Sequence, residues 1–114
     1  MRICVVGTGY VGLVVGTGFA ENGHFVTCVD KDPDCIATLN QGKPTIYEPG
    51  LEELMMRNAE EERLKFTSDL AAAIQDCLLI FLCVGTPENA DGSPDLSQVY
   101  AAAEEIGKNL NGYR

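Results

Sequence analysis

The chain has 114 residues, of which 46% are hydrophobic and 22% charged, a length and composition that predict one folded domain. Seventeen acidic residues against eight basic ones leave a net charge of −9. This charge argues against nucleic acid and anionic membranes as partners, because both attract cationic patches. The five cysteines are odd in number and have no C-x-x-C spacing, which argues against a zinc site or a disulfide framework and favours free thiols in a reducing cytoplasm.

The amino-terminal part predicts a strand, a helix and a second strand. Residues 3–6 form a short β-branched run that a glycine ends, which is typical of a buried parallel strand. Residues 10–22 are apolar nearly all round and predict a buried helix, with Gly23 as the residue that follows its C-cap. Residues 25–29 predict the second strand, which ends at Asp30.

The same stretch allows a different interpretation, because residues 3–20 carry no charge. An uncharged run of this length can be a signal peptide or a membrane helix. Five glycines make the run only weakly apolar, and no A-x-A-like cleavage site follows it. We therefore expect neither export nor insertion into a membrane.

The middle of the chain predicts three helices and one strand. In chain order these are a helix at 33–40 with Asp32 as its N-cap and Pro33 at its first position, a loop at 41–50, a helix at 51–62 with an acidic outer face, a strand at 64–67, and a brief helix that Ser68 or Asp69 caps and that ends near Gln75.

The last part predicts one strand and one helix. Residues 78–84 form an apolar run without alternation, which indicates a central parallel strand. Ser93 is expected to cap the final helix, with Pro94 at its first position and Asn111-Gly112 at its end. The residues expected on its apolar face are Leu96, Val99, Tyr100, Ala103 and Ile106.

The turn after the first strand matches the pattern G-x-G-x-x-G at Gly7, Gly9 and Gly12. The first glycine permits a tight turn, the second lets the backbone touch a pyrophosphate, and the third allows close packing of helix on strand. Free amides at the helix start can bind phosphates without a lysine, and no Lys or Arg lies between Ile3 and Asp30. The turn therefore predicts a dinucleotide site.

The alternation of strands and helices predicts the fold class. Such an order forms a parallel sheet through right-handed crossovers. A flavodoxin-like sheet would have a similar order, but the glycine pattern is specific to dinucleotide-binding folds. The predicted fold is an α/β doubly wound parallel sheet of the Rossmann type, incomplete, with about four strands in the order 3-2-1-4 and flanking helices.

Asp30, at the end of the second strand, is expected to accept hydrogen bonds from the ribose hydroxyls of adenosine. Its carboxylate would repel a 2′-phosphate, so we predict NAD rather than NADP as the cofactor. Lys31 follows it and could blunt that preference, or could simply be a solvated surface charge.

A second loop, at Gly85-Thr86-Pro87, is expected to border the cofactor, since ligands of doubly wound sheets bind at the carboxyl ends of the strands. An ordinary Thr-Pro turn would have the same sequence. His24 lies at the opposite edge and is interpreted as structural, so no catalytic residue and no metal ligand is predicted. The predicted cofactor-binding residues are Gly7, Gly9, Tyr10, Val11, Gly12, Asp30, Lys31, Val84, Gly85, Thr86 and Pro87.

Several segments resemble the UDP-glucose 6-dehydrogenase family. They are GTGYVGLV at 7–14, FAENGH at 19–24, IYEPGLEEL at 46–54, GTP at 85–87 and DGSPDLS at 91–97. The resemblance covers essentially the whole chain and implies oxidation of UDP-glucose to UDP-glucuronate with two NAD. It also implies that Val11, Asp30 and Thr86 contact the cofactor, whereas Cys35 stands where the family usually has Lys or Arg.

The resemblance further implies that residues 1–114 are the amino-terminal NAD-binding part of a longer enzyme. The family's catalytic residues would lie beyond residue 114, so we expect the chain alone to be inactive and UDP-glucose to bind only the intact enzyme. The alternatives are a dehydrogenase of GDP-mannose or UDP-N-acetylmannosamine, and a non-catalytic nucleotide-binding module. The strand at 78–84 would be an open edge, through which we expect homo-oligomerisation.

Overall fold

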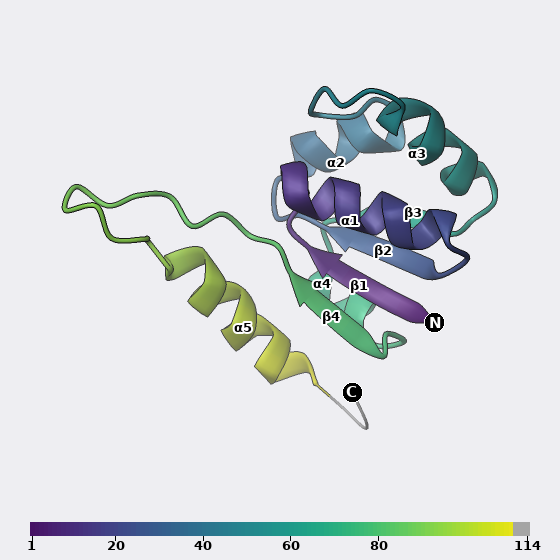
Figure 1. Cartoon of the computed structure of the whole chain (residues 1–114). Coiled ribbons are helices and arrows are strands. Elements are labelled where there is room, and N and C mark those ends of the chain that lie inside the picture. Colours follow the sequence, from purple (N-terminus) through teal and green to yellow (C-terminus); the bar gives the residue numbers. More distant parts are fainter. Residues whose placement is uncertain (111–114) are drawn as a thin grey trace.

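The computed structural model describes residues 1–110, and its centre is a sheet of four parallel strands in the order β3-β2-β1-β4 (Figure 1). The strands are β1 (Arg2–Val6), β2 (Phe25–Val29), β3 (Leu64–Thr67) and β4 (Leu79–Leu82). The helices are α1 (Tyr10–Glu21), α2 (Pro33–Asn40), α3 (Leu51–Glu60), α4 (Leu70–Ile74) and α5 (Ser97–Asn109). The predicted parallel sheet and its strand order are confirmed.

Helices cover both faces of this sheet. Successive side chains of a strand point to opposite faces, so β1 contributes alternate residues to the two cores on either side. Ile3 and Val5 pack with residues of α1, α2 and α3 in one core. Cys4 and Val6 pack with residues of α4 and α5 in the other. Figure 1 shows α1, α2 and α3 together on the upper side of the sheet.

Local capping rules account for most of the helix boundaries. The Asp32 carboxylate accepts two N–H groups of the first turn of α2, and Pro33 occupies its first position, as predicted. Gly23, with φ at 94°, follows α1, which ends one residue earlier than expected. Asp69 rather than Ser68 caps α4. Strands β2 and β3 span the predicted residues, and α3 ends at Glu60 instead of Glu62.

The strand β4 is shorter than predicted. It spans Leu79–Leu82 rather than 78–84, and within residues 1–110 it pairs with β1 alone. It is therefore an edge strand, as the predicted strand order 3-2-1-4 requires, and not the central strand that its apolar run indicated. Its Leu79 and Leu82 side chains are 42% and 41% exposed, since no further described strand lies beyond them.

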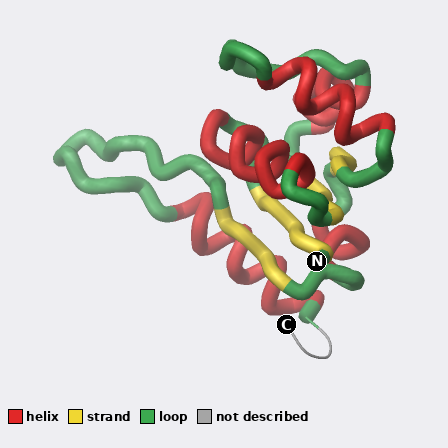
Figure 2. Tube along the Cα trace, turned by 45° about the vertical axis from the view of Figure 1, so that its right-hand side comes forward, coloured by secondary structure: helices red, strands yellow, loops and turns green. Residues whose placement is uncertain are grey.

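The final helix begins at Ser97 and not at Pro94, so the predicted start is wrong. The N–H and the hydroxyl of Ser93 both donate to Oδ1 of Asp91, at 3.0 and 2.6 Å, which holds Ser93 in a loop. The carboxylate of Asp95 instead accepts the N–H of Ser97, at 2.9 Å. Figure 2 shows the long loop between β4 and α5 reaching away from the sheet.

The apolar face predicted for α5 is wrong in part. None of the α5 residues is buried, and Tyr100 is 67% exposed. Val99 and Ile106 of the predicted face are half-buried as expected, whereas Leu96, Tyr100 and Ala103 are exposed. The half-buried side also includes Gln98 and Ala102, which precede Ile106 at intervals of four residues. Ala102 and Ile106 pack there against the core that contains α4. The predicted helix end at Asn111-Gly112 lies outside the described residues.

Candidate cofactor site

The carboxyl ends of β1 and β2 meet at the glycine turn that leads into α1. Gly7 adopts φ at 105°, and its N–H donates to the carbonyl of Val29 at 2.7 Å, which ties the turn to β2. A Cβ on Gly7 would come 2.5 Å from the carbonyl oxygen of Cys83, next to β4. A side chain at this position would therefore be strained and would also clash with the backbone.

The two other glycines of the turn face different surroundings. A Cβ on Gly12 would overlap the carbonyl oxygen of Gly7, so this glycine is needed for packing. A Cβ on Gly9 would meet nothing within 4 Å, so the backbone at Gly9 is open to an incoming group. Gly9 is also the N-cap of α1 and makes no side-chain capping bond, which leaves the first N–H groups of α1 available to an anion.

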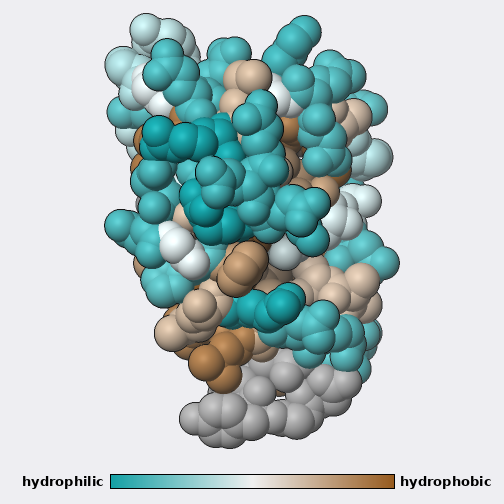
Figure 3. Space-filling view, turned by 90° about the vertical axis from the view of Figure 1, so that its right-hand side faces the viewer, coloured by the Kyte–Doolittle hydropathy of each residue, from teal (hydrophilic) through white to brown (hydrophobic). Residues whose placement is uncertain are grey.

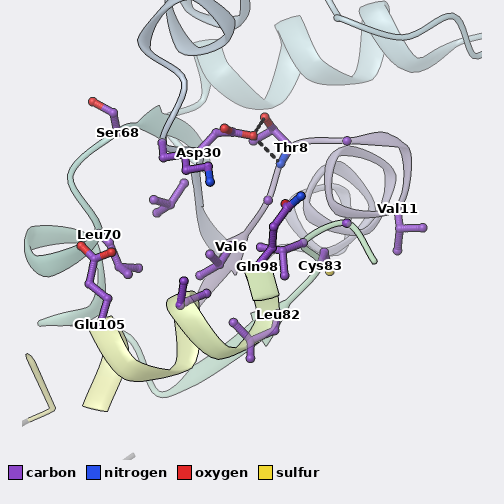
Figure 4. A pocket seen from close by; sticks show the side chains of 18 of the residues that line it. Val6, Thr8, Val11, Asp30, Ser68, Leu70, Leu82, Cys83, Gln98 and Glu105 are labelled. Carbon is purple, nitrogen blue, oxygen red and sulfur yellow. Dashed lines mark hydrogen bonds between the residues drawn. The ribbon is translucent and has the colours of Figure 1, made fainter. Parts of the chain in front are cut away.

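A cavity of about 910 Å³ opens beside this turn (Figure 4). Its volume lies within the range of small-molecule and cofactor sites. It is bounded by the glycine turn, the end of β2, the loop after β4 and one side of α5. Predicted cofactor residues that line it are Gly7, Gly9, Tyr10, Val11, Asp30, Lys31, Val84, Gly85 and Thr86.

Two predicted residues, Gly12 and Pro87, do not line this cavity. Gly12 packs under the turn, because its missing side chain makes room for the Gly7 carbonyl. Pro87 lies further along the loop, where its carbonyl accepts the N–H of Asp95 at 2.6 Å. Both residues therefore shape the backbone around the cavity without forming its wall.

Asp30 is the central polar group of the cavity. Its Oδ2 accepts the N–H of Thr8 at 3.1 Å and the Thr8 hydroxyl at 2.7 Å (Figure 4). Its Oδ1 accepts the N–H of Asp32 at 3.0 Å. Partial burial opposes the charge, but these hydrogen bonds outweigh it and hold the pKa of the Asp30 carboxyl below its ordinary value. The group is therefore a carboxylate at neutral pH.

Sequence analysis missed one wall of the cavity, which Ser68, Leu70, Gln98 and Glu105 help to form (Figure 4). Gln98 points from α5 into the cavity, and its amide would lie 3.7 Å from a Cβ on Gly85. Gln98 and Glu105 were not predicted, because the predicted face of α5 was centred on Leu96, Tyr100 and Ala103, which are exposed in the structure. A carboxylate at Glu105 adds to the negative charge that Asp30 brings.

Cys35 and His24 lie at opposite ends of the sheet. Cys35, in the first turn of α2, is close to the site, with its Sγ 3.3 Å from the Thr8 hydroxyl oxygen. His24 lies at the opposite end of β2, where its Nδ1 is 3.3 Å from the amino group of Met1 and its ring packs edge-on against Phe19. Within residues 1–110 no cluster of side chains could hold a metal, and no helix is long and apolar enough to cross a membrane.

The sequence of the chain matches a known protein family. Residues 1–114 match the sequence model described as UDP-glucose/GDP-mannose dehydrogenase family, NAD binding domain. The chain belongs to this family. Its cofactor is NAD, in agreement with the prediction.

Individual proteins of known name are similar to this chain in sequence and in structure. The chain is 50% identical, over 99% of its length, to UDP-glucose 6-dehydrogenase of Rhizobium meliloti, of which it covers 26%. A ternary complex of GDP-mannose dehydrogenase from Pseudomonas aeruginosa has a TM-score of 0.91 and 41% identity, over 94% of this chain and 24% of that one. UDP-glucose dehydrogenase from Pyrobaculum islandicum has a TM-score of 0.90 and 42% identity, over 95% and 25%. The chain thus spans about a quarter of the length of these proteins.

Proposed function

We propose that the chain forms the NAD-binding part of an enzyme that oxidises UDP-glucose to UDP-glucuronate with two molecules of NAD. The observation that carries the proposal is the ionised Asp30 beside the open backbone of Gly9, in a cavity at the carboxyl ends of the strands. Two NAD are required because each accepts one hydride, and the conversion of an alcohol to an acid releases two.

The residues of the cavity suggest how the cofactor is held. The pyrophosphate would lie over Gly9 at the start of α1, where uncapped N–H groups and the helix dipole favour negative charge. The adenosine ribose would donate to Asp30, and the loop at Gly85-Thr86 would border the other side. When bound, NAD supplies the hydride acceptor, while the chain itself contributes binding and orientation.

UDP-glucose is proposed as the substrate because relatives named UDP-glucose 6-dehydrogenase reach 50% identity over nearly the whole chain. The similar structures also include a GDP-mannose dehydrogenase and a UDP-N-acetylmannosamine dehydrogenase. These two sugar nucleotides are therefore the alternatives, and a comparison of oxidation rates on all three by the parent enzyme would decide between them.

We further propose that the chain on its own does not oxidise the sugar nucleotide. Cys83 is the thiol that lines the cavity, and burial raises the pKa of this thiol, which keeps it protonated and a poor nucleophile. His24 lies at the far end of β2 and cannot serve as a base there. Formation of NADH from UDP-glucose by the purified chain would overturn this proposal.

Cofactor preference is the direct test of the site. Calorimetric titration of the chain should show binding of NAD and much weaker binding of NADP, because the Asp30 carboxylate repels a 2′-phosphate. Equal affinities for the two cofactors would contradict the role given to Asp30. Binding of neither would mean that residues outside this chain complete the cavity.

The exposed apolar edge supports a proposal about assembly. Leu79 and Leu82 of β4 are both exposed, and within residues 1–110 this strand pairs with β1 alone. Figure 3 shows a face with hydrophobic residues in its lower part, below a mostly hydrophilic upper part. We propose that copies of the chain associate through the open edge of β4.

We also propose a cytoplasmic location for the protein. Its five cysteines are all free thiols, which is in keeping with a reducing compartment.

A further inference from the structure

Thr8 occupies a position that the glycine pattern leaves undefined, between Gly7 and Gly9. Its side chain is only 2% exposed, which is unusual for a polar residue in a turn that faces a cavity. The hydroxyl has two partners from distant parts of the chain, Oδ2 of Asp30 at 2.7 Å and Sγ of Cys35 at 3.3 Å. The glycine turn, the end of β2 and the first turn of α2 therefore meet at one hydroxyl group.

The direction of these hydrogen bonds follows from the chemistry of the three groups. An ionised carboxylate can only accept, so the Thr8 hydroxyl donates its single hydrogen to Asp30. That hydroxyl has no second hydrogen to give, so the thiol of Cys35 donates to the Thr8 oxygen. The result is a short relay from Cys35 through Thr8 to Asp30, in which each bond polarises the next.

The relay also limits what Asp30 can bind. A carboxylate has about four acceptor positions, two on each oxygen. The N–H and the hydroxyl of Thr8 occupy both positions on Oδ2, and the N–H of Asp32 occupies one on Oδ1. A single acceptor position is left, on Oδ1.

We propose that Thr8 is a positioning residue that, oriented by Cys35, fixes the Asp30 carboxylate so that only Oδ1 presents an acceptor to a ribose hydroxyl. The side chain of Thr8 acts through Asp30 and does not itself need to touch the cofactor. Asp30 then accepts a hydrogen bond from one ribose hydroxyl, and the other ribose hydroxyl bonds to a different group. The part that concerns the ribose rests on the proposed function of Asp30.

The first test needs no cofactor. Carbon-13 NMR of the carboxyl group would follow the titration of Asp30 in the full 114-residue chain and in its Thr8→Val, Thr8→Ser and Thr17→Val variants. Thr17, on α1, is a matched control because it is 1% exposed and its hydroxyl has no hydrogen-bond partner. Thr8→Val should raise the pKa of Asp30, whereas Thr8→Ser and Thr17→Val should leave it unchanged.

An unchanged pKa of Asp30 in Thr8→Val would overturn the proposal. Circular dichroism would show whether that variant is folded. If it is not, the unsubstituted chain decides the question. A bonded and buried Thr8 hydroxyl proton should exchange slowly enough to give its own NMR resonance, with nuclear Overhauser contacts to the protons of Cys35. A Thr8 hydroxyl proton that exchanges as fast as those of exposed threonines would also overturn the proposal.

The second test uses NAD as the probe. Thr8→Val should weaken NAD binding about tenfold, which corresponds to the free energy of one charge-assisted hydrogen bond. It should also reduce the ratio of the affinity for NAD to the affinity for NADP. Thr8→Ser should restore both properties, and Thr17→Val should alter neither. Asp30→Asn separates the two proposals. If it leaves NAD affinity unchanged while Thr8→Val still shifts the pKa of Asp30, the ribose contact is wrong and the positioning role stands.

Discussion

The unit β1-α1-β2 and the unit β4-loop-α5 belong to the same sheet, yet they are packed very differently. Strand β1 is buried from Ile3 to Val6, and five residues of α1 are buried. None of the residues of β4 and α5 is buried. The difference arises from position, because β1 has a strand on each side and helices on both faces, whereas β4 is an edge.

The cavity that we propose for the cofactor lies between these two units, and each contributes one kind of wall. The β1-α1-β2 unit supplies the glycine turn and Asp30, whose positions are held by close packing and hydrogen bonds. The β4-α5 unit supplies Gly85 and Gln98 from elements that are only lightly packed. Selectivity for the cofactor should therefore depend on the first unit, and assembly on the second.

The largest effect is expected where packing in the first unit is closest. Gly12→Ala should lower the free energy of unfolding by about 3 kcal/mol, because its Cβ would overlap the Gly7 carbonyl and backbone cannot rotate away. Gly18→Ala is the matched control in the same helix, since a Cβ there would meet nothing within 4 Å. It should stabilise the chain by about 0.5–1 kcal/mol. Urea unfolding followed by circular dichroism measures the free energy of unfolding of both variants. Equal values for Gly12→Ala and Gly18→Ala would contradict the close packing described for the first unit.

A smaller effect is expected from the charge of the first unit. Asp30→Asn should weaken NAD binding by about ten- to a hundredfold, because the amide is a poorer acceptor for a ribose hydroxyl than a carboxylate. NADP should lose less, since the repulsion of its 2′-phosphate disappears as well. Asp76→Asn is the control, since Asp76 is exposed between α4 and β4, away from the cavity. Calorimetry with both cofactors provides the comparison, and a parallel loss for the two would argue against charge as the source of selectivity.

The smallest effect concerns the second unit. Leu79→Lys places a charge on the open edge of β4 and should shift the chain towards monomer at high concentration, with little change in stability. Met56→Lys, on the exposed side of α3, is a comparable change away from the edge and should have no such effect. Light scattering over a range of concentrations gives the answer. A parent chain that stays monomeric throughout would refute self-association through β4.

The boundaries of β2, α2 and β3 could be predicted residue by residue, because Asp32, Pro33 and the apolar runs act over a few neighbouring positions. The glycine turn and the acidic residue after β2 could be predicted for the same reason, since each meets a requirement of the local backbone. The start of α5 could not be, because Ser93-Pro94 has the sequence of a helix start and yet bonds within a loop.

The sequence by itself determined the parallel sheet, its strand order and the glycine turn, because these depend on periodicity and on backbone requirements within short segments. Only the tertiary structure decided which side of α5 faces the cavity, and only it brought the Thr8 hydroxyl between Asp30 and Cys35. Those outcomes depend on contacts between residues that are far apart in the chain, and no local pattern specifies the distance between such residues.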